Sequence, residues 1–199
     1  LLLPSKSTLF KDADAPIHID IGSAKGEFLI ELASKYPEWN FLGLEIRESL
    51  VSSSERKRKK LGLENLKFLF CNVNISLDEW LSDLDYDQLK RVSIQFPDPW
   101  FKRKHFKRRV LKKSLLNSIA RYMSKDGELF IQTDIFKLFE SMTNVVDNSN
   151  YFDRKDAERF KWLDKNPYDA STDREFFVIE KNLPIYRVMY IRNSKLFIN

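Results

Sequence analysis

The stretch Ile17-His-Ile-Asp-Ile-Gly-Ser-Ala-Lys-Gly26 sets the fold class. Isoleucine at every second position predicts a buried strand over Ile17–Ile21, and the small residues up to Gly26 predict a tight turn. A helix is expected over about Glu27–Tyr36, because apolar residues recur there at helical spacing. A strand, a glycine-containing turn and a helix in this order are typical of an α/β protein with a parallel sheet.

Predicted strands and helices alternate along the rest of the chain. Further strands are predicted over Phe41–Glu45, Leu66–Phe70, Arg91–Phe96, Glu128–Thr133 and Ile185–Arg192, and further helices over Ser49–Leu61, Leu77–Leu84, Val110–Met123 and Phe136–Asn148. A turn is predicted at Lys125-Asp126-Gly127. No repeat and no Pro/Gly/Ser-rich linker divides the sequence, so we expect a single domain over residues 1–199.

Basic residues are concentrated in two segments. The 199 residues contain 34 Lys and Arg against 29 Asp and Glu, a net charge of +5. Eight of the basic residues lie between Lys102 and Lys113, and five lie between Arg56 and Lys60. The rest of the chain has 21 basic and 29 acidic residues, so it is acidic. Concentrated positive charge on an otherwise acidic protein points to a polyanionic partner.

The composition excludes several classes of protein. A hydrophobic content of 43% excludes global disorder, and the apolar runs are too short for a membrane-spanning helix. The single cysteine, Cys71, excludes a disulfide framework and a cysteine-based zinc site, and it fits a reducing compartment. The two histidines, His18 and His105, are too few for a histidine-rich metal centre. We therefore expect a cytoplasmic protein without metal or membrane contact.

Polar side chains follow the first five predicted strands. Acids end four of them and an asparagine follows the third, in the order Asp20, Glu45, Asn72, Asp98 and Asp134. In an open α/β sheet ligands bind at the carboxyl ends of the strands, and an acid after the second strand is the usual acceptor for ribose hydroxyls. The combination favours a nucleoside-containing cofactor. A tight turn with solvated acids, and an asparagine that only forms a turn, remain the alternatives for each signal alone.

The segment Phe96-Pro-Asp-Pro-Trp100 is the most specific stretch of the sequence. Its two prolines restrict the backbone on both sides of Asp98 and would hold this carboxylate beside the flat ring of Trp100. A carboxylate accepts hydrogen bonds from the edge of guanine, an aromatic ring stacks on a base, and the following Lys and Arg residues neutralise phosphates. The segment therefore favours nucleic-acid binding. A solvated basic helix start is the alternative.

Other conspicuous residues have plainer interpretations. The cluster Arg56–Lys60 is expected on the exposed side of an amphipathic helix. His18 is expected as a hydrogen-bonded core residue, and Cys71 as a small, partly buried residue at a strand end. The tryptophans are expected mostly in the core, with Trp100 as the exception.

Six motifs together resemble those of the bacterial tRNA (guanine-N7)-methyltransferases. They are Asp20-Ile-Gly-Ser-Ala-Lys-Gly26, Gly43-Leu-Glu-Ile46, Phe96-Pro-Asp-Pro-Trp100 running into Lys107-Arg-Arg109, Thr133-Asp134, Thr172-Asp-Arg-Glu175 and Pro184-Ile-Tyr-Arg187. The resemblance extends from about Ile17 to Tyr190. It implies a Rossmann-like class I methyltransferase fold of the α/β class, with a mostly parallel seven-stranded sheet flanked by helices and a late antiparallel strand.

The resemblance also implies an activity, the transfer of a methyl group from S-adenosyl-L-methionine to N7 of guanine 46 in the variable loop of tRNA. It implies cofactor binding by Asp20, Gly22, Gly26, Glu45, Asn72 and Asp98, substrate binding by Lys102, Asp134, Thr172, Asp173, Arg174 and Glu175, and RNA binding by Lys104, His105, Lys107, Arg108 and Arg109. Asp98 is expected as the catalytic residue, because methylation leaves positive charge on the base and a nearby carboxylate would stabilise it. The partner is tRNA, and the protein itself is expected as a monomer or homodimer.

Two positions depart from the family's pattern. Ala24 stands where a second loop glycine is common, which reduces the space near the methionine part of the cofactor. Phe101 stands where a proline is frequent, which removes one restraint beyond Trp100.

Two other functions stay open from the sequence. An amino-methyltransferase acting on adenine or cytosine carries a similar Asn/Asp-Pro-Pro-aromatic motif, but here a proline precedes Asp98. A non-catalytic RNA-binding module would keep the methyltransferase fold. A pocket that no longer binds a cofactor would be expected to lose its carboxylates, so the presence of Asp20 and Glu45 argues against this function.

Overall fold

The computed structural model describes residues 3–101, 103–155 and 162–197. Its elements are α1 (Lys6–Leu9), β1 (Ile17–Ile21), α2 (Glu27–Lys35), β2 (Asn40–Glu45), α3 (Glu48–Lys60), β3 (Leu66–Phe70), α4 (Val73–Leu81), β4 (Leu89–Gln95), the 3-10 helix η1 (Arg103–Arg108), α5 (Lys113–Tyr122), β5 (Met123–Thr133), α6 (Phe136–Asp147), β6 (Phe152–Arg154), α7 (Asp173–Glu180) and β7 (Tyr186–Arg192). One sheet contains the strands in the order β3-β2-β1-β4-β5-β7-β6. Strand β7 runs antiparallel to both of its neighbours. The predicted seven-stranded, mostly parallel sheet with a late antiparallel strand is therefore confirmed.

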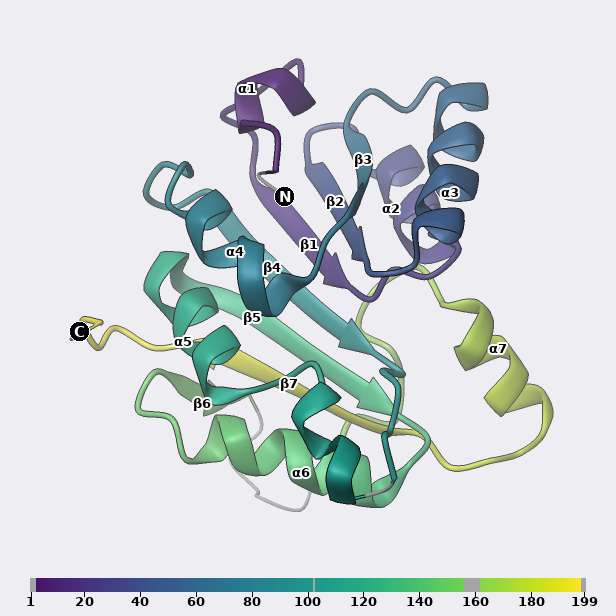
Figure 1. Ribbon diagram of the computed structural model, residues 1–199, viewed down its shortest axis with the longest axis vertical. Helices are drawn as coiled ribbons and strands as arrows, with labels where there is room; N and C mark the ends of the chain where they lie inside the picture. Colours follow the sequence, from purple (N-terminus) through teal and green to yellow (C-terminus); the bar gives the residue numbers. More distant parts are fainter. Residues whose placement is uncertain (1–2, 102, 156–161, 198–199) are drawn as a thin grey trace.

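Helices cover both faces of this sheet (Figure 1). On one face, alternate strand residues such as Ile19 and Ile94 join α4, α5 and α6 in the larger core cluster. On the other face, Phe41 and Phe68 pack with α2 in a second cluster, and α3 contacts the same strands. Consecutive strands run outward in opposite directions from the β1–β4 pair, and this is where an α/β sheet binds its ligands.

Small residues form the turn after β1 because its backbone requires them. Gly22 and Gly26 have positive φ angles of 84° and 77°, which glycine adopts without steric cost. A Cβ atom at Gly26 would come within 2.4 Å of the Phe68 ring, so this position also has no room for a side chain. Ala24 has a φ of 48°, a conformation that a glycine would adopt more easily.

Two predicted boundaries in the middle of the chain differ from the structure. The helix expected from Leu77 begins four residues earlier, at Val73, because the side chain of Asn72 accepts a hydrogen bond from the amide of Asn74 and caps it. The helix expected to start at Val110 begins at Lys113, and the basic segment before it forms the separate helix η1.

The turn predicted at Lys125-Asp126-Gly127 lies inside β5, which begins at Met123. The pairing with β4 jumps from Leu89–Met123 to Arg91–Glu128, so β5 has more residues than its partner over this stretch. Asp126 takes a positive φ of 64° there. The prediction of a turn between two elements was wrong, because pairing with β4 continues on both sides of a bulge.

Helix α7 is the main element that periodicity did not predict. It begins at Asp173 after Thr172, whose hydroxyl accepts a hydrogen bond from the amide of Glu175 at 3.1 Å. A threonine followed three residues later by a glutamate, just before apolar residues, is a helix-start signal. The motif therefore has a structural use besides any role in binding.

The plainer interpretations are confirmed with two exceptions. His18 is buried, with its Nε2 3.0 Å from Ser93 Oγ, and Cys71 is buried directly after β3. Within the Arg56–Lys60 cluster, however, Arg58 is buried, where it binds the Glu55 carboxylate and a main-chain carbonyl. Trp162 is 42% exposed, so the expectation of a core position was wrong for this residue. No helix within the described ranges is long and apolar enough to cross a membrane.

Candidate active site

A cleft of about 1000 Å³ opens at the carboxyl ends of β1, β2 and β4. It gathers residues that lie far apart in the sequence. The predicted site residues that line it are Asp20, Gly22, Glu45, Asn72, Asp98, Lys107, Arg108, Thr172, Asp173 and Arg174. Ten of the predicted site residues therefore lie in one cleft.

Asp20 forms part of the cleft floor and is only 3% exposed. Its Oδ1 accepts hydrogen bonds from Ser93 Oγ at 2.6 Å and from Gln95 Nε2 at 3.2 Å. Burial raises the pKa of Asp20 to about 6, and the nearby Glu45 carboxylate also raises it, against the lowering effect of the two hydrogen bonds. A cationic ligand next to this buried carboxylate would stabilise its charged form.

Glu45 ends β2 and is 4% exposed, held by main-chain donors. Its Oε1 accepts hydrogen bonds from the amides of Ile46 and Arg47, and its Oε2 accepts one from the amide of Ala24 at 3.1 Å. The Arg47 guanidinium also binds this carboxylate, at 3.1 and 3.3 Å, and the bond raises the pKa of Arg47. Three main-chain donors and the Arg47 guanidinium together fix the position of the Glu45 carboxylate.

The Pro97-Asp98-Pro99 segment presents an exposed carboxylate to the cleft. The residues on either side of it, Phe96 and Trp100, both have a positive φ of 45°, which is strained for aromatic side chains. Arg109 donates from Nε to the carbonyl of Pro99 at 3.2 Å and so supports the segment from behind. The strained backbone on both sides and the Arg109 bond to Pro99 therefore determine where Asp98 enters the cleft.

Helix α7 brings a second group of predicted residues to the cleft. Arg174 forms an ion pair with Asp134 at 2.6 Å, and Asp173 forms one with Lys25 at 3.2 Å. Thr172, Asp173 and Arg174 line the cleft, whereas Asp134 is joined to it through Arg174. Glu175 points away from the cleft and is 1% exposed, with its carboxylate bound by Arg187 at 2.8 Å.

The predicted RNA-binding residues are divided between the cleft and its outer surface. Lys107 and Arg108 line the cleft, and the Arg108 guanidinium lies 4.9 Å from the centre of the Trp100 ring. His105 contacts the same tryptophan edge-to-face at 5.7 Å, and Lys104 is exposed. Arg109 packs inward, with its Nη1 2.8 Å from Ser141 Oγ. Lys102 lies outside the described residues.

Several cleft residues were not found from the sequence. Arg47, Lys25 and Lys112 add positive charge, and Phe177 adds an exposed aromatic ring on α7. Arg47 lies just after β2, which ends at Glu45, and Lys25 lies in the turn after β1, so the strand-end rule applied to the acids also identifies this region. The place of Phe177 in the cleft can be inferred only once the position of α7 is known. Gly26, predicted as cofactor-binding, does not line the cleft.

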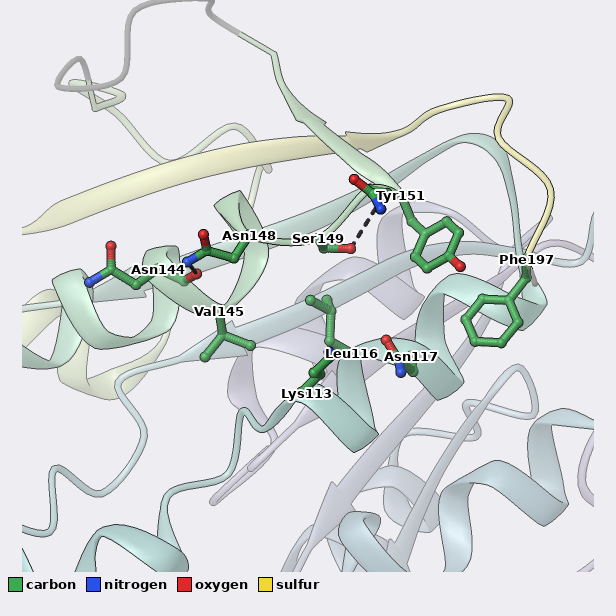
Figure 2. A pocket seen from close by; sticks show the side chains of 10 residues that line it. Lys113, Leu116, Asn117, Asn144, Val145, Asn148, Ser149, Tyr151 and Phe197 are labelled. Carbon is green, nitrogen blue, oxygen red and sulfur yellow. Dashed lines mark hydrogen bonds between the residues drawn. The ribbon is translucent and has the colours of Figure 1, made fainter. Parts of the chain in front are cut away.

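A second hollow of about 590 Å³ lies between α5, α6 and the C-terminal segment (Figure 2). Asparagines and two stacked aromatic rings, Tyr151 and Phe197, line it. It contains none of the predicted site residues. Among the described residues, no three His, Cys, Asp or Glu side chains are grouped so that they could hold a metal ion.

Comparison with known proteins places the chain in a family. Residues 14–188 match the family model described as "Putative methyltransferase". A tRNA (guanine-N(7)-)-methyltransferase of Prochlorococcus marinus strain NATL1A is 72% identical over 199 residues, which cover 100% of this chain and 93% of the relative. A protein of the same description from strain MIT 9313 is 50% identical over 193 residues, covering 97% and 82%.

A solved structure shares the fold. An rRNA methylase from Streptococcus thermophilus superposes with a TM-score of 0.58 at 14% identity, over 95% of this chain and 92% of that one. The two high-identity relatives cover nearly the whole sequence, and the strand-end cleft lies where this fold binds its ligands. The chain therefore belongs to the tRNA (guanine-N7)-methyltransferase family.

Proposed function

We propose that this enzyme transfers a methyl group from S-adenosyl-L-methionine to N7 of a guanine in tRNA, and that this guanine is nucleotide 46 of the variable loop. The observation that carries the proposal is the pair of buried carboxylates, Asp20 and Glu45, at the ends of neighbouring parallel strands and beneath a basic rim. The names of the relatives support tRNA guanine N7 as the acceptor. The resemblance of the motifs supports position 46.

The residues of the cleft fit the cofactor. The volume of about 1000 Å³ is large enough for a nucleoside with an amino-acid side chain. Glu45 would accept hydrogen bonds from the ribose hydroxyls, and Asp20 would attract the positively charged methionine part. Asn72 would bind the adenine edge, while Gly22 leaves the backbone open to close approach. When bound, S-adenosyl-L-methionine supplies a methyl carbon activated by a positively charged sulfur.

The chain's own contribution to catalysis is alignment and charge. N7 of guanine exposes a lone pair, so no residue has to remove a proton before attack. Methylation leaves positive charge on the imidazole part of the base, and the Asp98 carboxylate, which lines the cleft, would stabilise that charge as it develops. Arg174, held by Asp134, would orient the base, and Thr172 and Asp173 would complete this wall of the pocket.

The basic rim would hold the RNA over the pocket. Lys107 and Arg108 are exposed and line the cleft, while Lys104 and His105 extend the same surface on η1. Lysine and arginine neutralise phosphates, and the Trp100 ring, which contacts Arg108 and His105, offers a face or edge to a base.

The test is to incubate the enzyme with an unmodified tRNA transcript and methyl-labelled S-adenosylmethionine, and then to map the labelled nucleotide. We expect label at N7 of guanine 46, and none in a matched transcript with adenine at that position. Label in an adenine or cytosine amino group would support the amino-methyltransferase alternative. No label and no thermal stabilisation by the cofactor would support a non-catalytic RNA-binding module.

A further inference from the structure

A row of buried polar side chains crosses four adjacent strands on one face of the sheet. The register pairs Asp20 of β1 with Ser93 of β4, Gln95 of β4 with Gln132 of β5, and Gln132 with Arg187 of β7. All five residues are more than nine-tenths buried. Paired residues share a face of a sheet, so the row connects the cofactor acid to the strand beyond β5.

Hydrogen bonds make this row continuous. Gln95 donates from Nε2 to Asp20 Oδ1 at 3.2 Å, and its own Oε1 accepts from Gln132 Nε2 at 2.7 Å. Gln132 Nε2 also donates to Glu175 Oε2 at 3.1 Å. The last of these bonds leaves the sheet and reaches α7.

The far end of the row fixes α7 to the sheet. The Glu175 carboxylate binds Arg187 Nη2 at 2.8 Å and accepts from Asn166 Nδ2 at 2.7 Å. Glu175 lies in the first turn of α7, directly after the cleft residues Asp173 and Arg174. Figure 1 shows α7 at the side of the sheet. The buried Glu175 carboxylate therefore anchors the first turn of α7 to the sheet.

Gln132 sets the direction of the whole row. Its Oε1 accepts from Arg187 Nε at 3.0 Å, so its NH₂ group faces Gln95 and Glu175. The reversed amide would place its oxygen against the Glu175 carboxylate and its NH₂ group against a guanidinium. Because Gln132 donates to the Gln95 oxygen, Gln95 turns its own NH₂ group toward Asp20. The Arg187–Glu175 ion pair thus determines that the NH₂ group of Gln95, and not its oxygen, faces the Asp20 carboxylate.

We propose that Gln132 is a positioning residue that couples the cofactor side of the cleft to the RNA side through this row. The inference rests on the proposed function, since it takes S-adenosylmethionine at Asp20 and tRNA at α7 as the two ligands. A ligand at either end restricts the motion of Gln95, Gln132 and Glu175, and the second ligand then binds a row that is already ordered, so each ligand tightens the binding of the other.

The experiment measures that coupling with the full chain. The dissociation constant of S-adenosylhomocysteine, an unreactive probe, is determined by calorimetry with and without saturating unmodified tRNA. For the wild-type chain we expect tRNA to lower this dissociation constant by a factor of about five or more, the lower range for coupled sites. We call this ratio the coupling factor. In Gln132→Met, which keeps the length of the side chain but loses its hydrogen bonds, the coupling factor is expected to fall to about one.

Two further variants separate coupling from stability. Gln95→Met breaks the row next to Asp20 but leaves the Gln132 bonds to Arg187 and Glu175, and we expect it to lose the coupling as well. Ser124→Ala removes another buried hydrogen bond of β5, from Ser124 Oγ to the Leu89 carbonyl, outside the row. Ser124→Ala is expected to keep the wild-type coupling factor, although its melting temperature falls by about as much as that of Gln132→Met.

The outcomes distinguish this inference from the proposed function. Wild-type enzyme that methylates tRNA but shows no coupling overturns the inference alone, as does coupling that survives in both Gln132→Met and Gln95→Met. Loss of coupling in Ser124→Ala also overturns it, because any damage to β5 would then suffice. A wild-type chain that binds neither ligand overturns the proposed function, and the inference with it.

Discussion

The floor and the rim of the cleft carry opposite charges and are built in opposite ways. On the floor, Asp20 and Glu45 are almost fully buried, and short hydrogen bonds from neighbouring strands and main-chain amides hold their carboxylates. On the rim, Lys107 and Arg108 are exposed on the short helix η1. The floor is set by the sheet, whereas the rim depends on long side chains in solvent.

This difference separates two kinds of recognition. Buried charges interact with a ligand across little water, so salt screens them weakly, and their strength depends on exact placement. Exposed cations act over about 8 Å at physiological salt and attract any polyanion. We therefore expect floor variants to change cofactor binding or turnover, and rim variants to change the salt dependence of RNA binding.

The largest effect is expected for Asp98→Ala, at the boundary between floor and rim. Loss of the carboxylate that stabilises charge on the methylated base should lower kcat by about 100-fold, while the tRNA dissociation constant changes by less than about twofold. Single-turnover methylation and a filter-binding assay measure the two quantities. Asp83→Ala, an exposed acid between α4 and β4, is the matched control. Near-normal turnover in Asp98→Ala at saturating substrates would refute the catalytic role.

A smaller but specific effect is expected for Glu45→Gln. Replacing a charged acceptor by a neutral one should weaken S-adenosylmethionine binding by about tenfold or more, and the loss should be the same at low and high salt. Calorimetry at two salt concentrations tests this. Glu48→Gln, an exposed glutamate in the first turn of α3, should bind normally. An effect that disappears at high salt would mean that Glu45 acts only through long-range charge.

The raised pKa of Asp20 predicts that the affinity for the cofactor depends on pH. Because its pKa is raised from 3.8 to about 6, the carboxylate takes up a proton as the pH falls below 6. The affinity for a cationic cofactor should then fall by up to about tenfold per pH unit, and Asp20→Asn should abolish this dependence. Binding that stays constant from pH 7 to pH 5 would contradict the assignment of Asp20 to the cationic part of the cofactor.

The same group makes a prediction for stability with a definite sign. Between pH 3.8 and about 6 the folded state holds the proton more tightly than the unfolded chain, so the contribution of Asp20 to stability decreases as the pH rises. Asp20→Asn should therefore melt at a higher temperature than wild type at pH 8, with the difference vanishing near pH 4. Thermal melts across this range provide the measurement.

The smallest effect is expected on the rim, for Arg108→Ala. Removal of one phosphate contact should reduce the slope of log affinity against log salt by about 0.7 to 0.9, with a modest loss of tRNA affinity and an unchanged kcat. Lys60→Ala, an exposed cation at the end of α3, should leave the slope unchanged. Equal slopes for wild type and Arg108→Ala would place this arginine away from the RNA backbone.

Much of the fold and of the floor was predictable because both are encoded locally. The alternation of isoleucine in β1, the glycine turn after it and the acids at the strand ends are all read within a few residues. Parallel strands bring their carboxyl ends to one edge, so Asp20 and Glu45 were expected together before any coordinates. Helix α7 was missed because its apolar pattern is short, although its Thr172–Glu175 start signal was present.

The sequence by itself determined the α/β class, the strand-end acids and the concentrated positive charge, because these follow from local periodicity and composition. Only the tertiary structure decided that Glu175 faces the sheet rather than the cleft, that Arg109 supports the Pro99 carbonyl, and that Gln95 and Gln132 join Asp20 to α7. The Gln95–Gln132 contact depends on the register between β4 and β5, and the Glu175 contact depends on the position of α7 against the sheet. Gln132 lies 37 residues from Gln95 and 43 from Glu175, and Arg109 lies 10 residues from Pro99, so no local pattern specifies these contacts.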